Sequence, residues 1–495
     1  MDDPSVIIEE FRSGLSAREI ARLFDRERYN FILHSGMDAQ KLGRFSFIGS
    51  DPFLVFRSKN GDIEISDEGG TVSLEKGDPF HALKDLLARF RITAPQAAFP
   101  FTCGAVGYFS YDLCRHLERV PSRAADDLDL ADCFIGFYDT SIIIDHLKGR
   151  KYIASCGFPE TDSDKRKTRI KERVGYIKDA IMNKIVGAGS KPALDRGYKQ
   201  NRAGLEPAPT SNFTKDEYID AIGRAKRYIA DGDIYQVNLS QRFSCGENIA
   251  PRRLFERLCD INPAPFSAYM DLGDLKIISA SPERFLSKRG RSVHTRPIKG
   301  TRPRGSDPAE DERMKIELIS SPKDRAEHIM IVDLERNDLG RICEYGTVLP
   351  TEFIAIEKYA TVFHLVSTVS GTLREDVDAV DCLINCFPGG SITGAPKIRS
   401  MEIIDELEPT RRSIYTGSIG YIGFDGNMDS SVVIRTFIVK GGRVYFQVGG
   451  GIVADSDPEM EYQETLDKAK ALFESLGVGD TSGDRLRLEL ARGGH

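Results

Sequence analysis

A chain of 495 residues is longer than one hydrophobic core usually organises, so two domains or one large layered domain are expected. A formal net charge of −7 argues against a nucleic-acid-binding protein, and any basic site must therefore be local. The acidic N-terminus lacks a signal-peptide pattern and no apolar run is long enough to cross a membrane, so we expect a cytoplasmic protein.

Residues 1–190 are predicted to form a strand-rich N-terminal region. Short apolar segments separated by turns run from residue 29 to about residue 157. A charged segment near 162–187 is typical of a helix. Residues 191–212 are rich in Gly, Pro, Ala and Lys, and they are predicted to be a linker or a long exposed loop.

A second region, residues 213–479, is predicted to begin with a helix. Thr214 and Glu217 have the spacing of a capping box, and Phe213 and Tyr218 are placed to form a hydrophobic staple. Apolar residues then recur at helical spacing. We therefore predict a capped helix that starts directly after Thr214.

The segment that follows, Ile234–Ser240, alternates polar and apolar side chains as a strand does. Gln236, Asn238 and Ser240 share one face of that strand. A polar face beside a core is compatible with the wall of a cleft. An edge strand that turns this face to solvent is the alternative.

A glutamate and a lysine on neighbouring elements are candidates for chemistry. Residues 277–285 predict a strand that runs into a turn and presents Glu283, shortly before the basic segment Arg296–Gly305. Lys299 lies in that segment among three arginines, and an amine beside guanidinium charge loses its proton more easily and can act as a nucleophile. The alternatives are a salt bridge between Glu283 and Lys299, or a plain exposed basic turn.

Three glutamates on two predicted helices suit a hard cation. The first helix begins at Ser321 and carries Glu327 in an apolar stretch, which predicts a buried helix. The second spans about 457–477, and its Glu461 and Glu464 project from one face. Carboxylates without a histidine pair favour magnesium. Solvated helix faces are the alternative for Glu461 and Glu464.

Two glycine-rich segments and one arginine are candidates for binding an anion. Pro388–Lys397 precedes a helix expected from Pro396, and it lacks the Lys-Ser/Thr pair of a nucleotide-binding phosphate loop. Its backbone N–H groups could still bind an anion. Gly449–Gly451 follow a predicted strand and expose a second bare backbone. Arg435 is a planar donor suited to a carboxylate.

Several long motifs, in order, resemble the chorismate-utilising enzymes. They are SASPERF at 279–285, PIKGTRPRG at 297–305, AEHIMIVDLERNDLGR at 326–341, GGSITGAPKIRSMEII at 389–404, YTGSIGY at 415–421 and GGGIVADSDPEMEYQET at 449–465. FILHSG at 31–36 and GAVGYFSYD at 104–112 are similar to the N-terminal region of the large subunits of anthranilate and aminodeoxychorismate synthases. The resemblance implies an α+β fold in which two antiparallel sheets face each other, with helices outside, and a chorismate-binding catalytic domain at 213–479.

The resemblance also implies a branch of the family. Isochorismate and salicylate synthases carry a lysine where this chain has Gln236, so efficient addition of water is not expected. Anthranilate synthases have alanine where this chain has Lys299, and the PIKGT lysine resembles aminodeoxychorismate synthases. That branch converts chorismate and ammonia to 4-amino-4-deoxychorismate, a precursor of p-aminobenzoate and folate.

Each candidate residue takes an implied role from the resemblance. Lys299 would attack chorismate, with Glu283 as general acid. Glu327, Glu461 and Glu464 would hold Mg2+. The residues implied in substrate binding are Thr301, His364, Ser391, Tyr415, Arg435, Gly449, Gly450 and Gly451. A lone histidine such as His364 would otherwise be read as a core residue.

A partner and two rival functions complete the expectations. The chain lacks a glutaminase module, which implies a separate glutaminase subunit as the source of ammonia. Residues 480–495 are predicted to be a disordered tail. The rivals are an anthranilate synthase large subunit and a non-catalytic protein that binds chorismate or tryptophan. Anthranilate synthases use a Leu-Leu-Glu-Ser segment for tryptophan feedback, and His34 replaces that acid here, which leaves tryptophan binding open.

Overall fold

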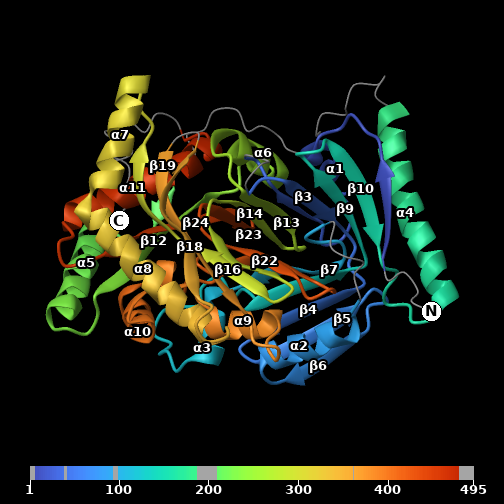
Figure 1. Ribbon diagram of the computed structural model, residues 1–495, viewed down its shortest axis with the longest axis horizontal. Coiled ribbons are helices and arrows are strands. Elements are labelled where there is room, and N and C mark those ends of the chain that lie inside the picture. The colour runs from blue at the N-terminus through green and yellow to red at the C-terminus, as the bar shows by residue number, and fades with distance from the viewer. Residues whose placement is uncertain (1–5, 38–41, 93–98, 187–208, 360–361, 479–495) are drawn as a thin grey trace.

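The computed structural model describes residues 6–37, 42–92, 99–186, 209–359 and 362–478, which form two large antiparallel sheets with helices around them (Figure 1). In spatial order, the first sheet contains β1 (Ile7–Phe11), β10 (Arg150–Ser155), β9 (Thr140–Asp145), β3 (Phe45–Gly49), β2 (Phe31–His34), β13 (Phe266–Asp271), β14 (Leu275–Ser281), β23 (Thr436–Lys440), β24 (Arg443–Ile452), β12 (Gln236–Gly246) and β11 (Thr210–Ser211), with β20 (Gly394–Ala395) also paired to β12.

The second sheet is also antiparallel and, like the first, combines strands from before residue 190 with strands from after residue 213. In order it contains β17 (Ile298–Pro303), β19 (Val362–Thr372), β16 (Ser292–Arg296), β15 (Arg284–Arg289), β22 (Met428–Val432), β21 (Ser418–Gly423), β7 (Gly104–Phe109), β8 (Cys133–Tyr138), β4 (Leu54–Lys59), β5 (Asp62–Asp67) and β6 (Val72–Lys76), with β18 (Leu349–Lys358) on the free side of β19. Strands from before residue 190 and after residue 213 therefore share both sheets.

The two sheets pack face to face around one core. Phe47 on β3 contacts Tyr421 on β21 across the two sheets, with ring centroids 5.6 Å apart. The largest buried cluster contains Ile277 of the first sheet and Phe56 of the second, and neither is exposed. Burying a side chain of this size contributes roughly 1.5–3 kcal/mol.

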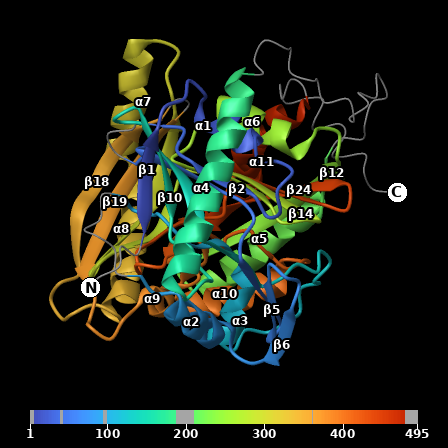
Figure 2. The same ribbon diagram turned by 90° about the vertical axis from the view of Figure 1, so that its right-hand side faces the viewer.

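The helices cover the outer surfaces of these sheets. They are α1 (Ala17–Arg22), α2 (Pro79–Arg89), α3 (Cys114–Leu117), α4 (Ser163–Val186), α5 (Lys215–Ala230), α6 (Pro251–Ile261), α7 (Pro308–Ser320), α8 (Pro322–Gly340), α9 (Ala379–Cys386), α10 (Lys397–Leu407) and α11 (Pro458–Leu476). Ile170 of α4 and Leu472 of α11 belong to one buried cluster with first-sheet residues such as Ile278. Figure 2 shows α4 standing upright outside the strands. The predicted α+β fold of two sheets with outer helices is thus confirmed.

The predicted capping box and hydrophobic staple at the start of α5 are confirmed. Thr214 Oγ1 accepts a hydrogen bond from the Glu217 N–H at 3.3 Å, and Glu217 Oε2 accepts one from the Thr214 N–H at 2.8 Å. The Phe213 and Tyr218 rings pack with centroids 5.4 Å apart. The strand-rich stretch and the charged helix also lie where predicted. Most of the predicted linker 191–212 and the tail 480–495 lie outside the described residues, and Thr210–Ser211 at the end of that linker form β11.

Removing this cap should weaken the protein measurably. We expect Thr214→Ala to lower the free energy of unfolding by about 1 kcal/mol, because the Glu217 N–H loses its acceptor and the Glu217 carboxylate loses the Thr214 hydroxyl. Urea unfolding followed by circular dichroism measures this. Thr214→Ser keeps the hydroxyl and should match the wild type; equal losses in both variants would show that the hydroxyl is not the cause.

Three local expectations were wrong. The basic segment is not a turn: Ile298–Pro303 form β17, which pairs with β19 and has a register shift at Gly300, where φ is +78°. Gly449–Gly451 do not follow a strand but lie inside β24, paired with β12. Helix α8 is buried along only one face, and Ile329 on it is 41% exposed.

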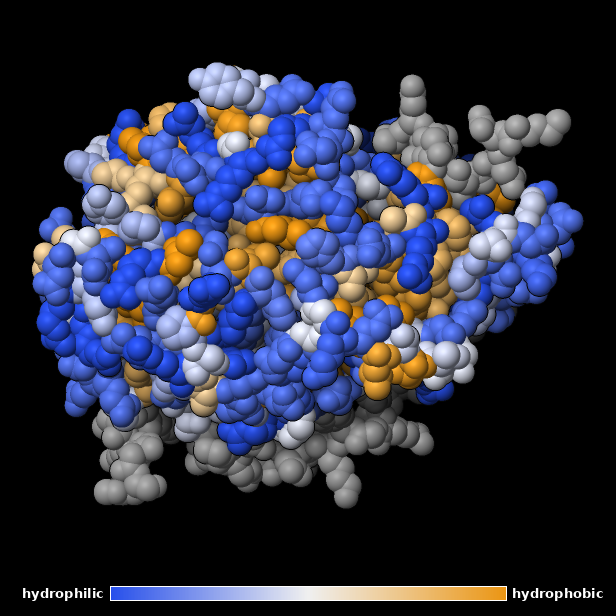
Figure 3. All heavy atoms as spheres, turned by 90° about the horizontal axis from the view of Figure 1, so that it is seen from below, coloured by the Kyte–Doolittle hydropathy of each residue, from blue (hydrophilic) through white to orange (hydrophobic). Residues whose placement is uncertain are grey.

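The surface shows no dominant apolar region on the face in Figure 3, where small apolar groups are scattered among hydrophilic ones. None of the helices in the described ranges has both the length and the apolar character that spanning a bilayer requires. The ends of β12, β17, β19 and β24 meet α8 and α11 at one side of the molecule, on the left in Figure 1, and this is where the candidate residues gather.

Candidate active site

Glu283 lies in the turn between β14 and β15 and is 5% exposed. The Ser391 hydroxyl donates a hydrogen bond of 2.7 Å to its Oε1. Burial raises the pKa of Glu283, while Ser391 and the positive charge of Lys299 oppose that rise. The carboxyl group is therefore placed to hold a proton closer to neutral pH than an exposed glutamate.

Lys299 lies on β17, directly before the bulge at Gly300. Its pKa is lowered, first by burial and next by the charge of Lys468, whereas Glu327, Glu283 and Glu464 act in the opposite direction. Among the described residues no ion pair joins Lys299 to Glu283, although each charge affects the pKa of the other. The amine is thus poised to lose its proton, as a nucleophile must.

The cause expected for this shift was wrong. The neighbouring arginines do not surround the amine, because each is bound by a carboxylate: Arg296 by Glu357 at 2.8 Å, Arg302 by Glu317 at 2.7 Å and Arg304 by Asp311 at 2.6 Å. Lys468, which was not identified from the sequence, is the cation whose charge lowers the pKa of Lys299. Its position four residues after Glu464 was the available signal, since i,i+4 pairs meet on a helix.

The three candidate metal ligands lie on α8 and α11, and besides burial the charge of Glu461 contributes to the raised pKa of Glu327. Oxygens of Glu461 and Glu464 lie 3.2 Å and 3.7 Å from the point where a Cβ on Gly450 would stand. Glu461 is 6% exposed, and burial raises its pKa and that of Glu327. Glu464 is half-exposed and paired with Lys468 at 2.6 Å, so a solvated face describes Glu464 better than Glu461.

These side chains do not form a closed metal cage. Within the described residues, no three His, Cys, Asp or Glu side chains stand close enough together to hold an ion. The donors are nonetheless all carboxylate oxygens, and Gly450 leaves space beside two of them. Because Mg2+ binds through one or two carboxylates plus water and substrate, this donor set fits that ion.

Thr301 and His364 face each other on β17 and β19. Thr301 Oγ1 and His364 Nδ1 lie 2.8 Å apart, and His364 Nε2 is buried without a hydrogen-bond partner. Burial and then the charge of Arg435 lower the pKa of His364 to about 3, so the ring is neutral. The partnerless nitrogen argues against a satisfied core histidine, because buried polar groups are normally paired.

Arg435 lies between β22 and β23 with φ at +51°. Burial lowers its pKa, opposed by the hydroxyl of Tyr359 and by Glu283. The part of the chain that the structure describes supplies no carboxylate in ion-pair contact with it. A partly buried guanidinium of this kind suits an anionic ligand.

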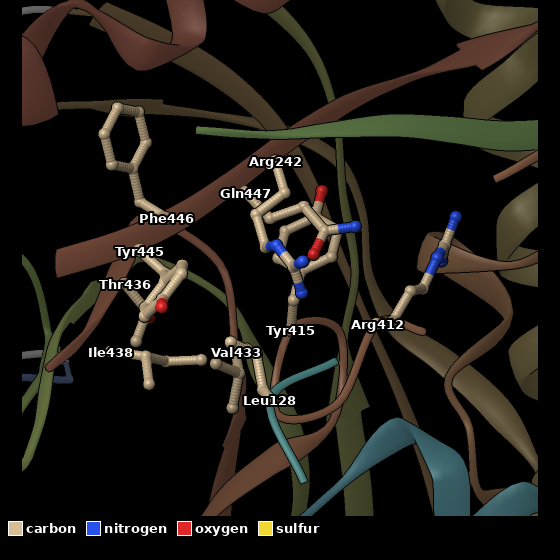
Figure 4. A pocket seen from close by; sticks show the side chains of 10 residues that line it. All are labelled: Leu128, Arg242, Arg412, Tyr415, Val433, Thr436, Ile438, Tyr445, Phe446 and Gln447. Atoms are coloured by element: carbon tan, nitrogen blue, oxygen red, sulfur yellow. The ribbon is translucent and has the colours of Figure 1, made fainter. Parts of the chain in front are cut away.

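Tyr415 and the glycines complete the substrate-binding set. Tyr415 is 9% exposed and lines a cavity of about 10 Å³ (Figure 4). Gly451 pairs with Asn238, and a Cβ on Gly451 would stand 2.5 Å from Gln236 Nε2. Both polar atoms of the Gln236 side chain are buried without a partner. Gln236 and Ser240 are buried and β12 is not an edge strand, so the alternative of an edge strand that turns this face to solvent was wrong.

His34 is placed at a separate cavity of about 210 Å³ between the sheets, lined also by Ser35, Arg44 and Tyr421. His34 Nδ1 lies 3.0 Å from Ser46 Oγ, which lies 2.7 Å from His146 Nε2. Burial and then His146 lower the pKa of His34 to about 3. The position that is acidic in the tryptophan-binding segment is therefore a neutral ring here.

Comparison with known proteins shows the family to which the chain belongs. The sequence matches the family described as chorismate binding enzyme over residues 29–474. It is 40% identical over 471 residues to anthranilate synthase component 1 of Acetivibrio thermocellus, covering 95% of this chain and 94% of that one. It is also 40% identical over 471 residues to aminodeoxychorismate synthase component 1 of Bacillus subtilis, covering 95% and 96%.

A solved structure has the same fold. The structure of anthranilate synthase component I from Streptococcus pneumoniae superimposes with a TM-score of 0.73 at 31% identity, covering 86% of this chain and 92% of that one. Relatives of both names are thus equally similar in sequence. The choice between the two reactions must come from individual residues.

Proposed function

Because the chain belongs to the family of chorismate binding enzymes, we propose that it is the large subunit of an aminodeoxychorismate synthase. The reaction would convert chorismate and ammonia to 4-amino-4-deoxychorismate. One observation favours this reaction over anthranilate synthesis. Lys299, which has a lowered pKa and lies beside Glu283, occupies the position at which anthranilate synthases are expected to have alanine.

In the first step, the neutral amine of Lys299 forms a bond to C2 of chorismate while the C4–O bond breaks. Glu283 donates its proton to the departing C4 hydroxyl, which leaves as water. The raised pKa of Glu283 supports an acid role, and the lowered pKa of Lys299 supports a nucleophile role.

In the second step, ammonia bonds to C4, the C2–N bond to Lys299 breaks, and the new ammonium group returns one proton to Glu283, so the neutral amine and the acid are both regenerated. The enolpyruvyl group stays on the product. Arg435, Tyr415 and the backbone at Gly449–Gly451 would bind its carboxylate, and Thr301, His364 and Ser391 would contact the ring. In anthranilate synthesis, by contrast, ammonia would add at C2 and pyruvate would leave.

Magnesium and a partner belong to the same proposal. Glu327, Glu461 and Glu464 would hold Mg2+, which when bound neutralises the ring carboxylate of chorismate and favours charge build-up there. The relatives are called component 1, which supports a second component for this chain. We propose a glutaminase subunit that supplies ammonia.

The test is to incubate the purified chain with chorismate, magnesium chloride and an ammonium salt at alkaline pH, and to identify products by liquid chromatography and mass spectrometry. Formation of 4-amino-4-deoxychorismate supports the proposal. Anthranilate and pyruvate would contradict it and assign the rival reaction. The absence of product with magnesium present would contradict both.

Arg435 gives a prediction for substrate binding. We expect Arg435→Gln to raise KM for chorismate by about 100-fold with a smaller change in kcat, because a buried charge-assisted contact to the substrate is lost. Steady-state kinetics over a range of chorismate concentrations measures this. Arg313→Gln on the exposed face of α7 is the control, and an unchanged KM in Arg435→Gln would contradict the assigned role.

A further inference from the structure

A fully buried ion pair stands behind the active site. The side chains of Arg412 and Glu408 are 1% and 2% exposed. Arg412 Nε donates to Glu408 Oε2 at 3.0 Å and Nη2 donates to Oε1 at 2.7 Å, so the pair is bidentate. Sequence reading missed both residues.

The remaining donors and acceptors of this pair reach two further elements, β12 and the glycine-rich loop. Arg412 Nη2 donates to the Asn238 carbonyl of β12 at 2.7 Å, and Nη1 donates to the Ile392 carbonyl of the glycine-rich loop at 3.0 Å. Glu408 Oε1 accepts from the N–H and the hydroxyl of Ser240, at 2.9 Å and 2.7 Å.

The same pair is close to the turn that carries Tyr415. Arg412 Nη1 donates to Thr416 Oγ1 at 3.3 Å, and its guanidinium carbon is 5.8 Å from the Tyr415 ring centroid. Figure 4 shows the two side chains rising from this turn. Strand β12, the glycine-rich loop and the Tyr415 turn therefore meet on one guanidinium group.

A short chain of hydrogen bonds continues from the pair to the proposed general acid. Asn238 donates through Nδ2 to the Ser391 carbonyl at 2.8 Å, and the Ser391 hydroxyl donates to Glu283 Oε1 at 2.7 Å. The position of the Ser391 hydroxyl is thus set by β12 and by the loop, both of which Arg412 holds.

Stability alone is a poor reason for this arrangement. Taking two charges out of water is expensive, and well-packed apolar side chains of similar size often stabilise a protein as well or better. We infer that Arg412 and Glu408 are positioning residues that hold the Ser391 hydroxyl against Glu283 and fix Tyr415 at the substrate. The inference rests on the proposed function for the role of Glu283.

The experiment separates positioning from folding. The double variant Arg412→Met/Glu408→Leu replaces the pair by apolar groups, and Arg412→Lys keeps the charge but not the bidentate fork. Arg169→Met/Asp139→Leu removes another pair, in which Asp139 is fully buried, far along the chain from the site residues. Thermal unfolding, kcat and KM are measured for all, with free ammonia held constant.

We expect both Arg412 variants to stay folded and to lose about 100-fold in kcat, because a misplacement near 1 Å in the site has an effect of that size. The double variant leaves the carbonyls of Asn238 and Ile392 and the N–H of Ser240 without these partners, so its unfolding temperature should fall, and kcat is compared below that temperature. The Arg169→Met/Asp139→Leu control should keep wild-type kcat. A wild-type kcat in a folded Arg412→Met/Glu408→Leu protein would overturn the inference.

The dependence of kcat on pH distinguishes a positioning role from a purely structural one, because loss of a purely structural contact would not shift it. The Ser391 bond stabilises the carboxylate form of Glu283, so its loss should raise the pKa of Glu283. The fall in kcat with rising pH should then occur at higher pH. The charged groups that act on Glu283, which are Lys299, Arg435 and the buried Glu335 of α8, are the same in all variants. Ser391→Ala should move the alkaline fall in kcat to higher pH in the same way. If the Arg412 variants have a lower kcat but this fall stays at the wild-type pH, the inference would also be overturned.

Failure of the proposed function can be told apart from failure of this inference. If the wild type makes anthranilate instead, the ratios of kcat are compared for that product. If the wild type makes no product, chorismate binding is measured by isothermal titration calorimetry. Weaker binding in the double variant then supports the positioning of Tyr415, and equal affinity contradicts it.

Discussion

Replacing Lys299 with alanine is expected to lower the formation of 4-amino-4-deoxychorismate by about 10,000-fold or more, because the proposed covalent step has no other nucleophile. The variant should remain folded, since burial of the Lys299 charge is unfavourable in the wild type, as its lowered pKa shows. Stopped assays followed by liquid chromatography and mass spectrometry measure the rate.

Two further observations make the Lys299 result specific. Intact-protein mass spectrometry of the wild type, quenched with acid during turnover in limiting ammonia, should show an adduct that the alanine variant lacks. Lys315→Ala, which removes a partly exposed lysine on α7 that pairs with Glu312, is the matched control and should react normally. Full activity in Lys299→Ala would remove the reason for preferring this reaction over anthranilate synthesis.

Glu283→Gln is expected to lower kcat by about 1,000-fold, because an amide cannot donate a proton to the departing hydroxyl. The sign of the pH effect follows from the shift. Burial raises the pKa of Glu283, so the protonated acid persists to higher pH and activity is lost as pH rises through that value. The wild-type kcat should therefore have an alkaline limb that Glu283→Gln lacks.

Binding distinguishes loss of the acid from loss of the site. Glutamine has nearly the same shape, so the variant should keep the affinity for chorismate measured by calorimetry. Glu312→Gln, on the exposed side of α7, should behave as wild type in both assays. An alkaline limb that survives in Glu283→Gln would assign the acid role to another group.

The sequence was informative where structure is decided locally. The cap at Thr214, the proline after Ser321 and the stop at Gly477 all depend on neighbours within four residues, and all are observed. Pairings such as β2 with β13 or β7 with β21 join residues hundreds of positions apart. No local pattern specifies them, and the two-sheet fold was predicted only through the family resemblance.

The candidate site shows the same contrast between features that depend on sequence neighbours and features that depend on distant residues. Residue types in motifs identified Glu283, Lys299 and Arg435, but their electrostatics depend on groups from other elements. Lys299 is influenced by Lys468, on α11, rather than by the arginines next to it in sequence. Arg412 was missed because its importance comes from contacts with Asn238 and Ile392, which are distant in the chain.

The sharing of both sheets between the two parts of the chain has a consequence for biosynthesis. Strands β2 and β7 emerge from the ribosome early, yet their partners β13 and β21 follow more than 150 residues later. Until then their backbone N–H and C=O groups on one side lack a partner, and such edges attract other strands. Strands β2 and β7 therefore stay unpaired on one side until β13 and β21 have been synthesised, so the incomplete chain is more prone to aggregate than the finished protein.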